Sequence, residues 1–523
     1  MTNLPIMVYN SQDSYSPKKG KGMAKYISEI IPPSEIDSWR WGDRVLITAQ
    51  TGSGKTNWVK NILYAHAKKR KKKILLLSNR NVLKRQNEHE LADKKDVITL
   101  KNYQSIETRI LEHGQTISEV FEHFDYIVFD EAHYWFSDSS FNRNTDLLMG
   151  TVKDCPDDKV FIYMTATPDV LLSYHDRFEH KYPKREDEKE FFNYNFIQAL
   201  YFYNDDGRVE NILDSIPFGE KAIYFSSAAT AYRTAYTRNN SVFVCSENNE
   251  EYGKYSSKET LKSIEETGQF EQPLLCTTTV LDTGLSISDE TVKHIILDIV
   301  DPVTLIQAIG RIRISGEQKI NVYIKNRHNG QIHFHLKEVK RIFKFATEML
   351  NLKKSMSPEE AKKAFQRKYA RRDFDNIIQN DFEVNYAKFY QVRYLKELFI
   401  QILTNKSKDG YKKFICSKLG MTISSTKVML AEETFEKRTI ENVLQKYIGK
   451  KLFKEEQEQF KEDFFECLFS PKRHINYRHR GIISINSILQ EDGKPYTIVS
   501  NRDWKESRRG GKRYWSIIKT EPP

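Results

Sequence analysis

A glycine-rich segment near the N-terminus constrains the fold of this 523-residue chain more than any other feature. Residues 49–56 read Ala-Gln-Thr-Gly-Ser-Gly-Lys-Thr and lie between an apolar run at 45–48 and a helical stretch at 57–66. A strand, a glycine-rich loop and a helix in this order form a P-loop, in which backbone N–H groups and the helix N-terminus bind phosphate. Ala49 stands where the usual pattern has glycine, so the match is one residue short of strict.

The loop predicts which residues hold a nucleotide. We expect Lys55 to reach the β and γ phosphates and the Thr56 hydroxyl to ligate Mg²⁺, so the expected cofactors are ATP and Mg²⁺. The expected nucleotide-binding residues are Gln50, Thr51, Gly52, Ser53, Gly54, Lys55 and Thr56. A glycine-rich turn that binds no ligand is the alternative, and the order of strand, loop and helix favours phosphate binding.

An acidic tetrapeptide follows a second apolar run. Asp130-Glu131-Ala132-His133 comes directly after the run at 126–129. A carboxylate at the carboxyl end of a parallel strand lies at the edge of the sheet where ligands bind, beside the phosphate loop. We therefore expect Asp130 to hold Mg²⁺, directly or through water, and Glu131 to polarise the attacking water.

Short apolar runs separated by helical stretches recur along the first two thirds of the chain. They lie at 45–47, 74–77, 97–98, 126–129 and 160–163, and again at 222–225, 242–244, 274–276, 295–297 and 322–324. Such alternation is the pattern of parallel sheets that are buried on both faces. The sequence therefore predicts an α/β fold with two tandem parallel-sheet domains.

The motifs and their order resemble those of superfamily 2 helicases over residues 25–328. Thr165-Ala166-Thr167 stands where that family links hydrolysis to nucleic-acid contact, and Gln307-Ala-Ile-Gly-Arg-Ile-Arg313 is similar to its arginine-finger motif. The resemblance implies two RecA-like domains, nucleic-acid-dependent ATP hydrolysis, and catalytic roles for Lys55, Asp130, Glu131, Gln307, Arg311 and Arg313. Many members place the second arginine one residue later, where this chain has Ile314, so the choice between Arg311 and Arg313 stays open.

The same resemblance implies which residues contact nucleic acid and which further residues contact the nucleotide. In the segment at 277–284, Asp282 and Gly284 are expected to contact nucleotide. The expected nucleic-acid contacts are Arg80, Tyr103, Gln104, Thr165, Thr167, Ser226, Ser227, Thr278, Arg508, Arg509 and Arg513. Upstream of the loop, Trp39 or Trp41 could stack on the base, and a core position is the alternative for both.

Charge is concentrated at the C-terminus. The chain has a formal net charge of +11, and residues 471–523 hold 12 Lys and Arg against 5 Asp and Glu, interleaved with aromatic residues. A small basic α/β or winged-helix-like module that contacts nucleic acid fits this pattern, and a basic fold that packs on the motor is the alternative. The basic run 68–73 has two interpretations as well, a solvated helix end or a nucleic-acid patch.

These patterns predict a domain order. The expected segments are a tail at 1–22, RecA-like domains at 23–172 and 213–328, a linker or insertion at 173–212, a helical accessory domain at 329–470 and the basic module at 471–523. The five cysteines are far apart, which favours a reducing compartment without zinc or disulfides. No apolar stretch approaches the length of a membrane span, so a cytoplasmic location is expected.

The function expected from the sequence is an ATP-dependent helicase or translocase with nucleic acid as its partner. DNA is favoured over RNA, in replication or origin processing of a phage, virus or mobile element, with replication proteins as further partners. The alternatives are an RNA helicase and a nucleic-acid sensor or origin-binding protein in which ATP only switches the grip.

Overall fold

The computed structural model describes residues 26–50, 52–78, 91, 93–140, 142–154, 156–184, 192, 194–247, 249–278, 286–314, 318–369, 374–379, 381–404, 407, 409–431, 440–467, 481–491, 493–503 and 512–520. The chain divides into two compact units. The first contains the described residues up to Phe202 and those from Phe218 to Val428. The second contains Tyr203–Pro217 and the described residues from Met429 onward.

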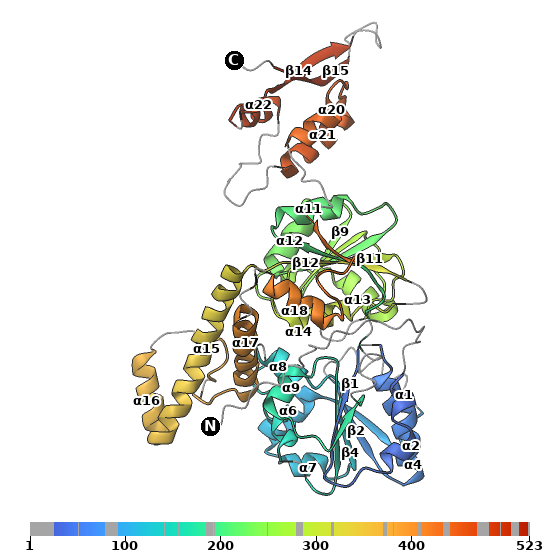
Figure 1. The fold of residues 1–523 in the computed structure, drawn as a ribbon, viewed down its shortest axis with the longest axis vertical. Coiled ribbons are helices and arrows are strands. Elements are labelled where there is room, and N and C mark those ends of the chain that lie inside the picture. Colours follow the sequence, from blue (N-terminus) through green and yellow to red (C-terminus); the bar gives the residue numbers. More distant parts are fainter. Residues whose placement is uncertain are drawn as a thin grey trace. The chain divides into compact units, whose positions relative to one another are not determined.

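The first α/β domain is built on a six-stranded sheet in the order β3-β2-β4-β5-β1-β6 (Figure 1). Its strands are β1 Arg44–Thr48, β2 Ile74–Ser78, β3 Ile98–Asn102, β4 Tyr126–Phe129, β5 Val160–Thr165 and β6 His180–Tyr182. Neighbouring strands in this sheet pair parallel. Strands β2, β4 and β5 are buried along their whole length, which explains why their sequences are continuous apolar runs.

Short helices cover this sheet. They are α1 Ile27–Ile30, α2 Pro33–Ile36, α3 Lys55–Trp58, the π-helical turn η1 Val59–Leu63, α4 Tyr64–Lys69, α6 Tyr103–His113, α7 Ile117–Phe121, α8 Tyr134–Ser137, the 3-10 turns η2 Asp138–Ser140 and η3 Met149–Val152, and α9 Asp169–Tyr174. The P-loop helix buries Trp58, Val59 and Leu63 against strands β1 and β2 in one apolar cluster. This packing holds the loop at the carboxyl edge of the sheet.

The second α/β domain is a seven-stranded sheet in the order β13-β7-β12-β11-β8-β10-β9. Its strands are β7 Ile197–Tyr203, β8 Lys221–Phe225, β9 Ser241–Val244, β10 Leu274–Thr277, β11 Val292–Leu297, β12 Ile320–Lys325 and β13 Val428–Leu430. Its helices within the first unit are α12 Ala228–Thr237, the 3-10 turn η4 Gly253–Tyr255, α13 Lys258–Thr267 and α14 Pro302–Ile309. The two parallel-sheet domains predicted from the apolar runs are confirmed.

The expected linker at 173–212 differs from the structure. Its residues supply β6 to the first sheet, β7 to the second sheet, and the start of α11 Gly207–Asp214 to the second unit. The mixed charges near 178–190 are typical of a linker, but an apolar alternation begins soon after them, at Ile197. Because β7 is buried at most of its positions, it forms part of the second core.

A helical region follows β12 and contacts both α/β domains of the first unit. Its helices are α15 Asn329–Ser355, α16 Pro358–Lys368, α17 Tyr386–Thr404 and α18 Gly410–Lys418, and α15 lies alongside α17 (Figure 1). Lys418 Nζ donates to Asp169 Oδ1 of the first domain at 2.7 Å. Tyr411 Oη donates to the Ile299 carbonyl of the second domain at 3.2 Å. Helix α18 therefore links the two domains.

The second unit includes a small basic module with its own core. Besides α11 Gly207–Asp214, this unit contains the elements of the module, which are α20 Ile440–Tyr447, α21 Lys454–Cys467, α22 Ile482–Glu491, β14 Tyr496–Asp503 and β15 Lys512–Lys519. Strands β14 and β15 pair antiparallel, and Leu452 forms an isolated bridge with Trp515. Leu444, Phe460, Ile485 and Ile498 share one apolar cluster, so the module begins near residue 440, before the expected boundary at 471.

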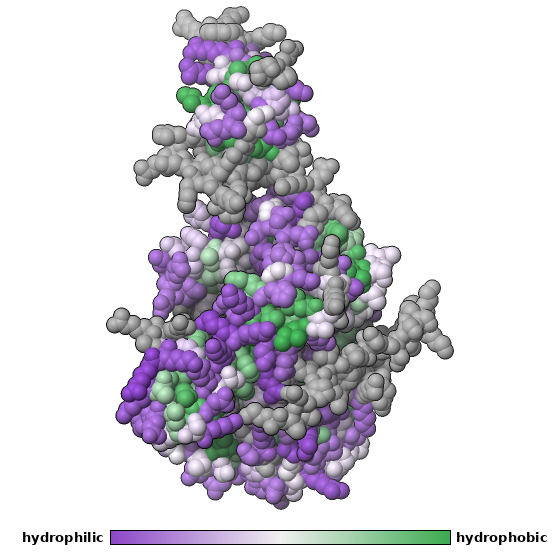
Figure 2. Space-filling view, turned by 60° about the vertical axis from the view of Figure 1, so that its left-hand side comes forward, coloured by the Kyte–Doolittle hydropathy of each residue, from purple (hydrophilic) through white to green (hydrophobic). Residues whose placement is uncertain are grey.

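In this module, helices precede a small antiparallel sheet that β14 and β15 form. The described helices include none that is long and apolar enough to cross a bilayer. On the face shown in Figure 2, hydrophilic side chains cover most of the surface and hydrophobic ones form small separate areas.

Candidate nucleotide-hydrolysis site

The P-loop adopts a backbone that needs its glycines. Gly52 has φ +90° and Gly54 has φ +82°, in the left-handed region that side chains disfavour. Lys55 Nζ donates to the carbonyls of Ala49 at 2.7 Å and Gln50 at 3.2 Å, so the loop curves around this lysine. Burial lowers the pKa of Lys55, and the nearby carboxylates Glu131 and Asp130 oppose that effect. A buried lysine inside a loop of backbone amides is a site for phosphate.

Thr56 and Asp130 meet at the position expected for the metal. Thr56 Oγ1 donates to Asp130 Oδ2 at 3.1 Å, across from the P-loop helix to the end of β4. Burial raises the pKa of Asp130 to about 6, and the neighbouring charge of Glu131 adds to the rise. No group of three or more His, Cys, Asp or Glu among the described residues could hold a metal. One carboxylate and one hydroxyl fit Mg²⁺, which completes its shell with phosphate oxygens and water.

Glu131 lies directly beyond Asp130 in a strained backbone conformation. Its φ is +53°, which is uncommon for a residue with a side chain. Burial would raise the pKa of Glu131, but the adjacent His133 and the cations Lys55, Arg311 and Arg313 outweigh burial and lower it. Glu131 is therefore ionised at neutral pH, as a group that orients water must be.

Both arginines of the second domain reach this site. Arg313 Nε donates to Ser286 Oγ at 3.0 Å, and Arg313 Nη1 lies 3.3 Å from the position that a Cβ on Gly52 would occupy. Arg311 is 4 % exposed, and both arginines are close enough to Glu131 to influence its charge. Burial and the neighbouring Arg311 lower the pKa of Arg313. The structure thus brings both candidates to the nucleotide site and places Arg313 against the P-loop.

Three buried polar atoms at this point lack a hydrogen-bond partner in the described part of the chain. They are Ser53 Oγ of the P-loop, Glu131 Oε2 at the end of β4 and Arg313 Nη1 of the second domain. Buried polar atoms usually find partners, so a set of exceptions marks a place where a ligand or water supplies them. A donor from each domain and a carboxylate acceptor suit a phosphate group with an attacking water beside it.

A chain of polar contacts connects Glu131 to the second domain. His133 Nδ1 lies 3.3 Å from Glu131 Oε2 and 3.1 Å from Thr165 Oγ1. The Thr167 backbone N–H donates to Thr165 Oγ1 at 3.0 Å, and Gln307 Nε2 donates to Thr167 Oγ1 at 2.8 Å. Burial lowers the pKa of His133 to about 4, so the imidazole in this chain is neutral.

Several residues that were expected to contact nucleic acid have other surroundings in the structure. Tyr103 is 0 % exposed, stacks on Tyr134 with ring centroids 5.0 Å apart, and donates to the Asp130 carbonyl at 2.8 Å. Its side chain is buried and does not face nucleic acid. Its hydrogen bond holds the end of β4 instead. Gln104 donates to Tyr134 Oη, while Thr165 and Thr167 are buried in the chain of contacts described above.

The remaining residues that were expected to contact nucleic acid differ in how exposed their side chains are. Ser226 is buried at the end of β8, Thr278 is half-buried, and Ser227 is exposed where it caps α12 by accepting from the Thr230 N–H. Arg513 is exposed on β15. The expected contacts Thr51, Arg80, Asp282, Gly284, Arg508 and Arg509 lie outside the described residues.

The aromatic side chain beside the P-loop is Tyr26. Its Cδ1 lies 3.3 Å from where a Cβ on Gly54 would be, its side chain is 57 % exposed, and the Ile27 N–H donates to the Ser53 carbonyl at 3.2 Å. Trp39 instead packs on Trp58, and Trp41 packs on Tyr126. Sequence reasoning missed Tyr26 because its approach to the loop depends on how helix α1 folds back.

The basic run at 68–73 belongs to a helix end and to ion pairs. Lys68 and Lys69 occupy the last turn of α4. Arg70 pairs with Asp37, and Lys72 with Asp125 at 2.8 Å. These contacts support the interpretation as a solvated helix end over that of a nucleic-acid patch.

Residues 34–170 match the family described as type III restriction enzyme, res subunit. No curated protein sequence matches the chain. Among solved structures, Saccharomyces cerevisiae Dbp5 bound to RNA and ADP BeF3 is 15% identical, with 55% of this chain and 80% of that chain covered and a TM-score of 0.38. A putative HsdR subunit fragment of a type I restriction enzyme from Vibrio vulnificus is 19% identical, with 55% and 60% covered and a TM-score of 0.37.

The DUF1998 helicase MrfA bound to DNA is 14% identical, with 58% of this chain and 46% of that chain covered and a TM-score of 0.39. The family match, the two parallel sheets and the ordered motifs support an ATP-hydrolysing enzyme. The matched segment contains the P-loop and the acidic motif, and in these motifs the chain is similar to superfamily 2 helicases.

Proposed function

We propose that this superfamily 2 enzyme couples ATP hydrolysis to movement along DNA or to its unwinding. The observation that carries the proposal is the meeting of Arg313 with the P-loop at Gly52, because hydrolysis then depends on how the two domains are placed. A site assembled from two domains can report its nucleotide state as a change in their arrangement.

The residues divide the chemistry of hydrolysis among them. Lys55 and the loop amides bind the phosphates, and Glu131 orients the attacking water. Arg313, with Arg311 behind it, stabilises the charge that develops on the γ-phosphoryl group. Thr56 and Asp130 would hold Mg²⁺, which supplies a further positive charge on the phosphates. Each group lies within the site described above, so no large rearrangement is needed to bring them together.

Buried polar contacts couple ATP hydrolysis to the binding of nucleic acid. Thr165 and Thr167 connect Glu131 and His133 with Gln307 of the second domain. Separation of the two domains would break the contact between Thr167 and Gln307 and would withdraw Arg313 from the loop. The enzyme therefore hydrolyses ATP fastest when strand binding holds the domains together.

The basic module supports DNA as the track. Arg502 and Arg513 are directly opposite each other on β14 and β15, and Lys512 is adjacent, with all three exposed. The exposed residues of α22, which are Ile483, Ser487, Gln490 and Glu491, include no cation. Cations that lie together on the hairpin and not on this helix favour phosphate contacts along a duplex over base reading.

The decisive experiment is ATP hydrolysis by the full chain with no polymer, single-stranded DNA, duplex DNA or RNA. DNA should stimulate turnover at least tenfold, and Lys55→Ala should abolish it. Glu131→Gln should bind ATP and DNA but fail to hydrolyse ATP, which separates binding from chemistry. Equal rates with and without every polymer would refute the motor.

Two alternatives are read from the same assay. Stimulation by RNA alone would identify an RNA helicase. Stimulation by DNA without strand displacement or translocation would identify an ATP-switched sensor or origin-binding protein. The compact motor with a terminal basic module supports a setting in replication or origin processing of a phage, virus or mobile element, with replication proteins as partners.

A further inference from the structure

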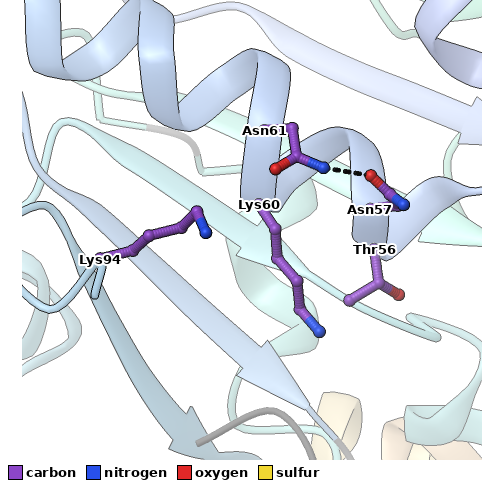
Figure 3. Close-up of a pocket in the computed structure, with 5 residues that line it drawn as sticks. All are labelled: Thr56, Asn57, Lys60, Asn61 and Lys94. Atoms are coloured by element: carbon purple, nitrogen blue, oxygen red, sulfur yellow. Dashed lines mark hydrogen bonds between the residues drawn. The ribbon is translucent and has the colours of Figure 1, made fainter. Parts of the chain in front are cut away.

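A polar recess opens beside the P-loop helix, next to the hydrolysis site. It has a volume of about 250 Å³ and is lined by Thr56, Asn57, Lys60, Asn61 and Lys94 (Figure 3). The first four residues occupy one stripe of the helix that follows the loop. The Lys94 side chain extends toward Lys60 from the opposite wall (Figure 3). Every described lining residue carries a hydrogen-bond donor, and two are cations.

The recess shares a residue with the metal position. Thr56 lines the recess, and its hydroxyl also donates to Asp130 at 3.1 Å. Lys60 is 8 % exposed and lies in the π-helical turn η1, a type of turn that often occurs at functional sites. The recess is therefore adjacent to the position of the γ-phosphate.

The charges around the recess favour an anion. Lys94 Nζ lies 3.2 Å from Asp93 Oδ1, but the Asp93 side chain is 76 % exposed, and such a surface pair is weak. Asn61 donates to Asn57, so the amide of Asn57 is oriented by its neighbour on the helix. No acidic side chain is among the described residues that line the recess. Two lysines and two amides suit a small tetrahedral oxyanion.

We propose that this recess receives the inorganic phosphate released by hydrolysis, with Lys60 and Lys94 as its main contacts and Thr56 between it and the reaction site. The inference rests on ATP hydrolysis at the P-loop. A route on this side lets phosphate leave while ADP still occupies the loop. A phosphate group of a nucleic-acid strand could occupy the same recess. The position of the recess next to Thr56 and Asp130 favours the inorganic phosphate released by hydrolysis.

The first test measures binding of radiolabelled inorganic phosphate to the ADP-loaded full chain by equilibrium dialysis. Lys94→Gln should weaken phosphate binding about fivefold or more, since it removes a charge-assisted hydrogen bond at a partly exposed position. Lys69→Gln removes one charge from the exposed end of the same helix and should bind phosphate like the wild type. Lys60→Gln should weaken binding, and Lys60→Arg should largely retain it.

The second test compares phosphate release, followed with a fluorescent phosphate sensor, with hydrolysis followed by rapid quench. In Lys94→Gln, release should slow about threefold or more while the hydrolysis step keeps its rate. Wild-type phosphate affinity in both glutamine variants would overturn the proposal. So would a variant that loses DNA affinity and keeps phosphate affinity, because the recess would then serve the strand. Phosphate binding needs no polymer, so this result is independent of whether DNA stimulates the enzyme.

Discussion

Gln307 of the second domain donates from Nε2 to Thr167 Oγ1 of the first domain at 2.8 Å, and both side chains are buried. Thr167 also donates from its backbone to Thr165, whose hydroxyl lies beside His133. The contact thus joins helix α14 to the segment after β5. It is the point at which a change in the arrangement of the domains can reach the residues next to Glu131.

The contact between Gln307 and Thr167 should be energetically coupled to strand-stimulated hydrolysis. Gln307→Ala leaves the buried Thr167 hydroxyl without its partner, at a cost of about 1–3 kcal/mol. A double-mutant cycle with Thr167→Val should therefore show a coupling energy of about 1 kcal/mol or more in DNA-stimulated kcat. Additive effects of the two changes would show that the contact plays no part in coupling.

Arg313 should contribute more to the chemical step than to nucleotide binding. Arginines that act on the γ-phosphate contribute about 10³-fold or more to hydrolysis. Arg313→Ala should lower the single-turnover rate by about that factor and leave ATP affinity within a few-fold. Arg311→Ala is the matched comparison, because both arginines approach Glu131. A larger loss in Arg311→Ala would reassign the direct contact to that residue.

Tyr26 should act as a platform for the nucleotide base. Its ring lies against Gly54 and remains 57 % exposed, and stacking of a base on an aromatic ring contributes about 1–3 kcal/mol. Tyr26→Ala should therefore raise KM for ATP at least fivefold, about 1 kcal/mol, with little change in kcat. Tyr26→Phe should behave like the wild type.

The control for the base contact is Trp41→Ala. Trp41 is 46 % exposed but packs on Tyr126 with ring centroids 5.9 Å apart, and Lys72 lies over it. Its removal should leave KM for ATP unchanged. An increase in KM for Trp41→Ala that matches the increase for Tyr26→Ala would remove the base contact from Tyr26.

The hairpin should contribute phosphate contacts that depend on salt. Arg513 lies directly opposite Arg502, and two like charges placed this way favour an anion between them. Arg513→Gln should weaken DNA binding and reduce the slope of log Kobs against log salt by about 1. Lys519→Gln, at the other end of β15, removes the same charge and should leave the slope unchanged. An unaltered slope in Arg513→Gln would favour a hairpin that packs on protein.

Asp463 should stabilise the basic module at neutral pH. Its carboxylate accepts from Lys446 Nζ at 2.8 Å, Tyr447 Oη at 2.7 Å and Gln459 Nε2 at 3.2 Å. Burial would raise the pKa of Asp463, but these hydrogen bonds outweigh burial and lower it. Because the folded pKa is depressed, the stabilisation is present above the unfolded pKa of about 3.9 and is lost as pH falls through the folded pKa.

Asp463→Asn should therefore destabilise the module by about 1–3 kcal/mol at pH 7, with a difference from the wild type that shrinks below about pH 4. Hydrogen exchange of α20 and α21 in the full chain measures this local stability. Glu458→Gln is the control, because Glu458 is 63 % exposed and pairs only at the surface with Lys461. A constant difference at every pH would show that the carboxylate charge is not the cause.

Local sequence patterns predicted the sheets and the centre of the site because both depend on strand order. Apolar runs must lie inside parallel sheets, and the carboxyl ends of parallel strands converge, so Thr56 and Asp130 were expected to meet. Side-chain direction is a different matter. Tyr103 stands at an expected motif position, but its ring is buried under Asp130, which a motif cannot reveal. Residue type alone does not say which way a side chain points.

Tertiary packing explains the other differences. Tyr26 reaches the P-loop only because helix α1 folds back and Ile27 bonds to Ser53. The start of the basic module was expected at 471, yet Leu444 and Phe460 bury their side chains against Ile485. The apolar face of an amphipathic helix predicts that the helix packs against another element, but it does not predict which element. The proposed preference for Arg313 over Arg311 likewise rests on its approach to Gly52, which only the folded chain shows.

Helix α18 has a mechanical consequence for the enzyme. Lys418 is bonded to Asp169 directly after the threonine segment of the first domain, and Tyr411 is bonded to Ile299 of the second. A rotation that separates Thr167 from Gln307 must therefore stretch one of these bonds or carry the helical region with one domain. If the chain works as the proposed motor, each such rotation also moves the helices α15–α18 relative to at least one of the two domains.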